Sequence, residues 1–133
     1  MKIESVTVEV QSDQENIFQF LTDSNNILHL LPQDKITDWQ ASSTECSFKV
    51  QGGVIISLLQ DGNQGLDKVF MKSGPNSPFP FRLTLNIIKE ENSVKGNIQF
   101  DGEVSMFLKL IVEKPLTNLF NHMSEKLKEQ FAH

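Results

Sequence analysis

Residues 116–131 read LTNLFNHMSEKLKEQF, and their apolar side chains are spaced for a helix. The apolar residues recur at intervals of three or four, at Leu116, Leu119, Phe120, Met123, Leu127 and Phe131. At about 100° per residue they fall within a stripe about 120° wide, which is the core face of an amphipathic helix. From Met106 onward the chain therefore holds a helical segment able to cover a large apolar surface.

A proline stands directly before this stripe. Pro115 removes a backbone amide and obstructs the preceding carbonyl, so we predict a kink or a restart of the helix there. The segment Lys109–Glu113 (KLIVE) is apolar around much of a turn. One hypothesis is that Phe107–Leu108 and Leu110–Val112 form a contact between two copies of the chain, which would make a homodimer through the start of the C-terminal helix.

Two segments upstream alternate between apolar and polar residues, as strands with one buried face do. The apolar parity holds Phe79, Phe81, Leu83, Leu85 and Ile87 in the first segment, and Val94, Gly96, Ile98, Phe100, Gly102 and Val104 in the second. Polar residues, among them Asn86 and Asn97, occupy the other parity and predict a wet face. We expect an antiparallel sheet covered by the C-terminal helix, because no other segment is long enough.

The rest of the chain supplies one more strand at the start, two short helices and further strands. Val6–Val10 alternates as a strand, and Ser12 with Glu15 forms a capping box that begins a first helix. Asp23–Asn26 caps a second helix, which Pro32 ends. Turn signals, including one at 61–65, separate candidate strands at 36–41, 45–51, 54–60, 66–73, 79–89 and 93–104. These elements predict an α+β fold in a single domain, residues 1–133, with a sheet of about seven strands.

The proline-rich stretch SGPNSPFPF, residues 73–81, lies between two of these strands. Asn76–Pro78 is predicted to make the hairpin connection. Phe79 and Phe81 carry the inward parity of the strand that follows, and Pro80 carries the outward one, where a missing amide is tolerated.

Composition narrows the classes of function. The chain carries 17 acidic against 12 basic side chains, a net charge of -5, and Arg82 is its single arginine. Nucleic-acid binding normally leaves a basic, arginine-rich footprint, so nucleic acid is excluded as a partner. Cys46 is the only cysteine, which excludes an intrachain disulfide and a cysteine-based zinc site. Residues 1–10 do not read as a signal peptide, and no apolar run reaches the roughly 20 residues that span a bilayer. We expect no integral membrane segment and a cytoplasmic location.

The order of elements, together with the motifs NIFQFLTD at Asn16–Asp23 and EKPLTNL at Glu113–Leu119, resembles the START-like or SRPBCC superfamily. Its members include polyketide cyclases, lipid-transfer domains and birch-pollen-allergen-type proteins. The resemblance implies a helix-grip fold, in which a curved antiparallel sheet wraps the long C-terminal helix and leaves an apolar cavity. It implies as ligand a small hydrophobic molecule such as a lipid, an isoprenoid or a polyketide.

The candidate ligand-binding surface is the apolar face between sheet and helix. It would draw on Trp39, Phe48, Val50, Phe79, Phe81, Leu83, Phe100, Met106, Phe107, Leu116, Phe120 and Met123. Gly96 and Gly102 are expected to leave gaps between side chains on this face, and methionines suit a site that must repack.

No catalytic set converges on that surface. His122 projects about 120° from the centre of the helical stripe, and Cys46 shares the inward parity of Phe48 as a small core residue. His29 and Asp38 are the first candidates if the protein is instead an enzyme of the polyketide cyclase or hydratase kind. No metal-ligand spacing and no phosphate loop is present in the sequence, so we predict neither metal nor cofactor.

Overall fold

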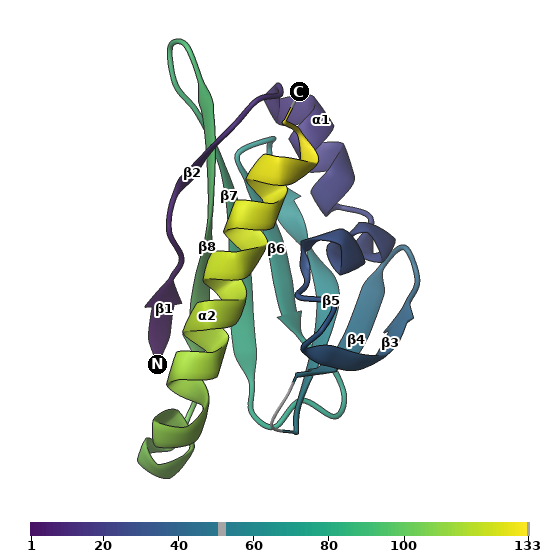
Figure 1. Cartoon of the computed structure of the whole chain (residues 1–133), viewed down its shortest axis with the longest axis vertical. Coiled ribbons are helices and arrows are strands. Elements are labelled where there is room, and N and C mark those ends of the chain that lie inside the picture. The colour runs from purple at the N-terminus through teal and green to yellow at the C-terminus, as the bar shows by residue number, and fades with distance from the viewer. Residues whose placement is uncertain (51–52, 133) are drawn as a thin grey trace.

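The computed structural model describes residues 1–50 and 53–132, and in it an antiparallel sheet curves around one long helix (Figure 1). The sheet contains β1 (Lys2–Glu4), β2 (Val8–Val10), β3 (Ile36–Ala41), β4 (Glu45–Val50), β5 (Val54–Gln64), β6 (Lys68–Ser73), β7 (Phe81–Lys89) and β8 (Val94–Gly102). The helices are α1 (Gln14–Leu21), the 3-10 helix η1 (Ser24–Leu30) and α2 (Met106–Gln130). This is the predicted α+β architecture, with eight strands where about seven were expected.

The strand order is β1-β8-β7-β6-β5-β4-β3, and β2 also pairs with β8. The extra strand is β1, which precedes the predicted strand Val6–Val10, and only residues 8–10 of that prediction form a strand, β2. The pairing of the N-terminal segment with β8 is thus split between β1 and β2 by Ser5–Thr7. Ser5 is buried there and its Oγ lies 2.8 Å from Oγ of Ser124 on α2. The amide of Val6 donates to Oδ1 of Asn121, 2.8 Å away, so the split lets the N-terminal segment bind the helix as well as the sheet.

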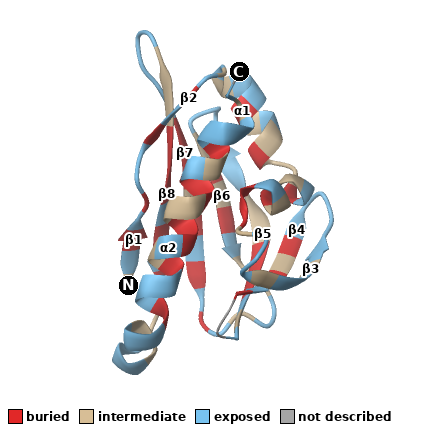
Figure 2. Cartoon of the chain, in the orientation of Figure 1, coloured by how far each residue is buried: buried red, intermediate tan, exposed pale blue. Residues whose placement is uncertain are grey.

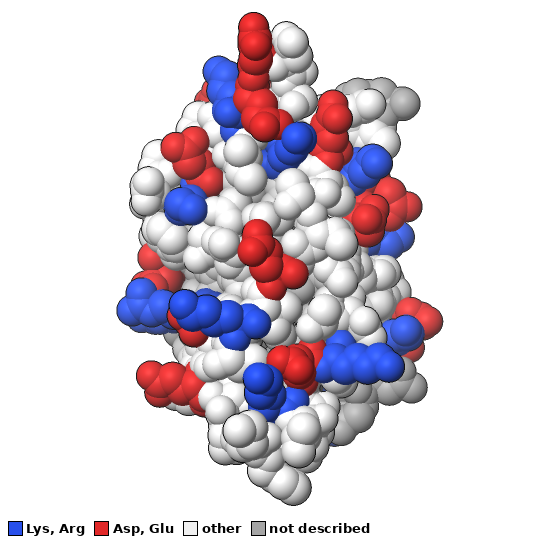
Figure 3. Space-filling model, turned by 90° about the vertical axis from the view of Figure 1, so that its left-hand side faces the viewer, with Lys and Arg blue, Asp and Glu red and all other residues white. Residues whose placement is uncertain are grey.

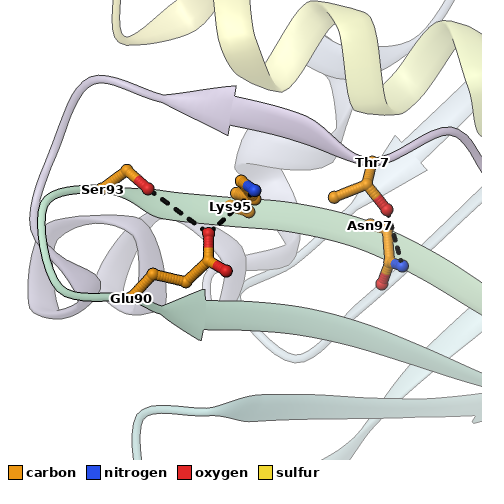
Figure 4. Close-up of polar contacts among 5 residues, drawn as sticks. All are labelled: Thr7, Glu90, Ser93, Lys95 and Asn97. Atoms are coloured by element: carbon orange, nitrogen blue, oxygen red, sulfur yellow. Dashed lines mark hydrogen bonds and ion pairs between the residues drawn. The ribbon is translucent and has the colours of Figure 1, made fainter.

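The β7–β8 hairpin confirms the predicted parities. Phe81 pairs with Gly102 and Leu83 with Phe100, and all four face the core. At the hairpin tip, Nζ of Lys95 lies 2.8 Å from the carboxylate of Glu90, to which Ser93 also donates (Figure 4). The lysine, first through its hydrogen bond and then through its charge, lowers the pKa of Glu90.

The outer face of the sheet is less wet than its parity predicts. Asn86 and Asn97 are buried, because they belong to a row of hydrogen bonds that crosses four strands. Asn86 accepts from Nζ of Lys68 at 2.8 Å and donates to Oδ1 of Asn97 at 2.8 Å. Asn97 in turn donates to Glu4 at 3.1 Å. It also donates to Thr7 at 3.2 Å, as Figure 4 shows. Satisfied amides of this kind are compatible with burial.

Helix α2 lies across the concave face of the sheet and buries the predicted stripe (Figure 2). It begins at Ser105, whose side chain accepts from the amide of Leu108. The helix continues through Pro115, so the predicted restart does not occur. Because Pro115 has no amide hydrogen, the carbonyl of Ile111, four residues earlier, loses its usual helical hydrogen bond. Both residues are exposed, so water can replace that hydrogen bond.

Two local predictions near the short helices need correction or refinement. The N-cap of α1 is Asp13, whose carboxylate accepts from the amide of Asn16 at 2.8 Å, and not Ser12 as the capping box predicted. Serine and aspartate both favour the N-cap position, and the two residues are adjacent, so the sequence alone did not decide which of them caps the helix. Asp23 caps η1 as expected, through the amide of Asn25.

Two strands contain irregularities that the turn signals did not locate. The pairing of β3 with β4 shifts between Thr37 and Gln40, where Asp38 adopts a positive φ of 57°. The predicted turn at 61–65 lies partly inside β5, whose pairing with β6 shifts between Gln60 and Asn63. Gly62, with φ of 91°, supplies the left-handed backbone that such a bulge uses.

Candidate functional site

The structure gathers most of the predicted ligand-binding residues into one buried cluster. Phe48, Val50, Phe79, Phe81, Leu83, Phe100, Leu116, Phe120 and Met123 are all buried. Trp39 is half-buried, with its ring stacked 6.2 Å from that of Phe48. Met106 and Phe107 are 78% and 72% exposed, so their predicted place on the inner surface is wrong. They lie in the first turn of α2, at the lower end of the molecule, where the sheet ends (Figure 1).

Four phenylalanine rings fill the space in which a cavity was expected. Phe100 is central, with ring centroids 5.3 Å from Phe81, 5.4 Å from Phe120 and 6.2 Å from Phe79. Tilted and edge-on contacts at these distances are favourable aromatic packing. The inward direction of Phe79 and Phe81 is therefore confirmed, and both rings take part in a packed core.

The predicted gaps at the two glycines are filled as well. A Cβ at Gly102 would lie 2.7 Å from two ring atoms of Phe100, and one at Gly96 would lie 3.2 Å from Cδ2 of Leu127. Each glycine thus makes room for a neighbouring side chain instead of for a ligand. The enclosed hollow beside Met123 and Leu127 measures about 10 Å³, which holds about one water molecule.

The open pocket lies elsewhere, between the middle of α2, the connection from η1 to β3, and the end of β4. Its volume is about 340 Å³, and it is lined by Pro32, Lys35, Val50, Lys114, Pro115, Asn118, Leu119 and His122. Helix geometry explains the wall that α2 provides, since residues four apart lie on the same face. Lys114, Asn118 and His122 form a polar row, and Pro115 and Leu119 form an apolar row beside it.

The pocket wall is cationic, although the whole chain is acidic. Among the described residues that line it, Lys35 and Lys114 are charged and none is acidic, and the acidic groups that act on the wall include Asp34, which affects the pKa of His122. His122 is half-buried, and its Nε2 atom is buried without a hydrogen-bond partner among the described residues. An unpaired polar atom in the wall of an open pocket is available to a water molecule or to a ligand that enters the pocket.

Burial lowers the pKa of His122, because it disfavours the charged imidazolium. Lys126 and Lys35 lower this pKa further, while Glu129 and Asp34 oppose the shift without cancelling it. The native protein therefore binds this proton less readily than the unfolded chain does. Below the ordinary histidine value of 6.5, the unfolded state gains the proton first, so the free energy of unfolding falls as the pH is lowered.

We predict that His122→Gln makes this fall shallower between about pH 6.5 and pH 5. The measurement is urea denaturation followed by circular dichroism at several pH values. His29→Gln, at an exposed histidine, is the matched control for the loss of an imidazole. Equal slopes for the wild type and His122→Gln would contradict the prediction.

The residues suspected of catalysis do not meet in this pocket. Asp38 and His29 are both exposed, and neither lines the pocket. Burial, with a smaller effect from Glu45, raises the pKa of Cys46 to about 12, so its thiol is inert. Among residues 1–50 and 53–132, no group of histidine, cysteine and acidic side chains could hold a metal ion. His122 is left as the titratable imidazole of the pocket, without a carboxylate there to orient it.

A larger hollow of about 490 Å³ on the outer face is a weaker candidate. It is lined by charged residues of both signs, among them Lys2, Glu4, Arg82 and Asp101. Opposite charges that alternate in this way favour no class of ligand, so the pocket at α2 is the better candidate.

Sequence reasoning found one wall residue of that pocket, Val50, and missed the rest as ligand contacts. The usable signal was the four-residue spacing of Lys114, Asn118 and His122, which places a polar row next to the apolar stripe. Pro32 and Lys35 carried no such signal, since the fold alone brings them opposite α2.

No protein-family model matches the chain, and no curated protein matches it. Solved structures do. The KanY protein has a TM-score of 0.76 at 14% identity, over 98% of this chain and 97% of its own. A START superfamily protein from Mycobacterium smegmatis has a TM-score of 0.68 at 13% identity, over 98% and 96%. A protein from Thermus thermophilus has a TM-score of 0.71 at 12% identity, over 98% and 97%.

These likenesses establish the architecture. The chain has the START-like helix-grip fold that its sequence resembled, over essentially its whole length. Identities this low speak for the fold alone, and the ligand has to be argued from the pocket. Within the described part of the chain, no helix is long and apolar enough to cross a membrane.

Proposed function

We propose that the protein binds a small apolar molecule, such as a lipid, an isoprenoid or a polyketide, in the pocket between α2, the η1–β3 connection and the end of β4. The observation that carries the proposal is the pocket itself. Its volume of about 340 Å³ falls within the range of small-molecule sites, and Pro32, Val50, Pro115 and Leu119 give it an apolar floor. Burial of apolar area, at roughly 25 cal/mol per Å², would drive binding.

Two of the predicted ligand-binding residues lie in the core directly behind the pocket wall. Leu116 and Met123 are buried on α2 within a turn of the pocket residues Leu119 and His122.

The test is native mass spectrometry of the purified protein, organic extraction, and titration with the neutral dye Nile red. We expect a co-purifying apolar species or saturable dye binding. Asn118→Trp, which fills the pocket from an exposed position on α2, should abolish dye binding, whereas Glu125→Trp, exposed on the same helix outside the pocket, should not. Dye binding unchanged by Asn118→Trp, or no bound species by any method, would overturn the proposal.

A second candidate function is self-association through the start of α2. The four side chains Met106, Phe107, Leu110 and Ile111 are 78%, 72%, 83% and 52% exposed. They lie together where α2 begins, at the lower end of the molecule, which carries no charged side chain at its tip on the face seen in Figure 3. A contiguous apolar patch on an acidic domain commonly marks an interface, and the same patch on two copies can form a twofold contact.

We predict that the wild type is a dimer in light scattering at micromolar concentration and that Leu110→Asp is a monomer, since a buried charge without a partner opposes the contact. Glu113→Gln, outside the apolar patch on the same helix, is the control and should leave the dimer intact. A wild-type protein that is monomeric throughout would remove this second function and would leave the binding proposal untouched.

A further inference from the structure

In the part of the chain that the structure describes, the two lysines of the pocket, like Lys128, lack the ion pairs that two other lysines of α2 form. Lys109 and Lys126 are paired with Glu113 and Glu129, at 3.8 Å and 3.5 Å. Lys114 and Lys35 have no carboxylate within ion-pair distance among the described residues, and no acidic side chain lines the pocket between them. In a chain whose net charge is -5, the pocket wall therefore carries two positive charges that form no ion pair among the described residues, although the carboxylate of Asp34 lies near enough to His122 to affect its pKa.

These charges lie beside an apolar floor. Lys114 continues the polar row of Asn118 and His122, and Pro115 and Leu119 form the apolar row next to it. Lys35 reaches the pocket from the opposite wall, in the η1–β3 connection. A ligand that satisfies both rows has one anionic end and one apolar body.

We propose that the natural ligand is an amphipathic monocarboxylic acid, whose carboxylate lies between Lys35 and Lys114 while its apolar body lies against Pro115, Leu119 and Val50. The proposal rests on the proposed binding function and adds the chemical class of the ligand. A carboxylate suits two lysine ammonium groups, which act as point charges. The wall has no arginine among the described residues, because Arg82 lies on the outer face of the sheet, so an anion here is held by charge and not by a bidentate fork.

The unpartnered Nε2 atom of His122 is the second observation that points to a ligand here. His122 is the last residue of the polar row on the pocket wall. Its Nε2 atom can donate or accept a hydrogen bond, depending on the tautomer of the ring. Along the helix His122 lies about 12 Å from Lys114 and about one turn from Asn118, so this atom is available to the part of a ligand that lies beside Asn118.

The experiment compares decanoic acid with 1-decanol, which have the same chain length and differ in charge. Isothermal titration at pH 8 and low salt should give an affinity about tenfold higher for the acid. In the double variant Lys35→Gln/Lys114→Gln this preference should disappear while the affinity for 1-decanol stays unchanged. Lys89→Gln/Lys128→Gln, at exposed lysines outside the pocket, changes the net charge equally and should keep the preference.

The outcomes separate the two proposals. If the wild type binds 1-decanol as tightly as decanoic acid, the binding function stands and the carboxylate is wrong. If neither compound binds, the binding function itself fails. If both double variants reduce the preference for the acid equally, the preference comes from the overall charge of the protein, and the proposed carboxylate site is wrong. The wild type can also be tested by changing the salt concentration. Its preference for decanoic acid over 1-decanol should fall severalfold between about 20 mM and 500 mM NaCl. A preference that does not change with salt would also overturn the proposal.

Discussion

Replacing Phe100 with alanine is expected to lower the free energy of unfolding by about 3–5 kcal/mol. Its side chain is 2% exposed, and its ring contacts those of Phe79, Phe81 and Phe120 at the centre of the interior cluster. Alanine would forfeit this burial and leave a cavity that rigid strands cannot close. Since small domains are stable by only about 5–15 kcal/mol, urea denaturation should show a large shift of the midpoint.

Phe107→Ala is the matched control. The same residue type is removed, but the ring is 72% exposed, so stability should change by less than about 0.5 kcal/mol. The measurement is made at low protein concentration, so that any dimer contact of Phe107 does not contribute. Comparable losses for the two variants would show that the aromatic cluster is not the stabilising core described above.

A single added methyl group at Gly102 is expected to cost about 1–3 kcal/mol. The new Cβ would lie 2.7 Å from Cε1 and Cζ of Phe100, much closer than carbon atoms approach one another. The ring would have to move, and Phe81 and Phe120 pack against it. The cost comes from lack of space, because Gly102 does not adopt a positive φ. Thermal and urea denaturation of Gly102→Ala would measure it.

A double-mutant cycle tests the proposed cause. In a Phe100→Leu background the aromatic edge is gone, so Gly102→Ala should cost clearly less than it does in the wild type. Gly96→Ala is the control and should be milder, because its Cβ comes closest to the end of the Leu127 side chain, at 3.2 Å, and its other neighbours, Asn86 and Val10, lie at 3.6 Å and 3.7 Å, which are ordinary contact distances. If the effects of Gly102→Ala and Phe100→Leu simply add, the clash is not the mechanism.

Alternation and helical spacing predicted the sheet and α2 because both patterns record one physical event, the burial of a single face. The residues of β7 and β8 that face the core are those of the predicted apolar parity, from Phe81 opposite Gly102 to Ile87 opposite Gly96. The stripe from Leu116 to Leu127 is buried for the same reason. A long element that buries one face repeats the same apolar spacing at many positions, so its position in the fold can be predicted from the sequence.

The predictions that failed concern features that no repeated pattern records. Met106 and Phe107 are apolar, but hydrophobicity does not say where the sheet beneath a helix ends. The interior was expected to be hollow, yet only three-dimensional packing could show that the ring of Phe100 fills the space at Gly102. The pocket joins Lys35 to Lys114, residues far apart in the chain that only the fold brings together.

The shifted pairing in β3 has a consequence for the behaviour of the protein in concentrated solution. β3 is the last strand on its side of the sheet, where a regular edge would offer unpaired amides and carbonyls to another molecule. The left-handed backbone at Asp38 interrupts that row, and the exposed carboxylate adds a charge to it. A broken, charged edge is a poor template for strand addition and so protects the fold against edge-to-edge aggregation.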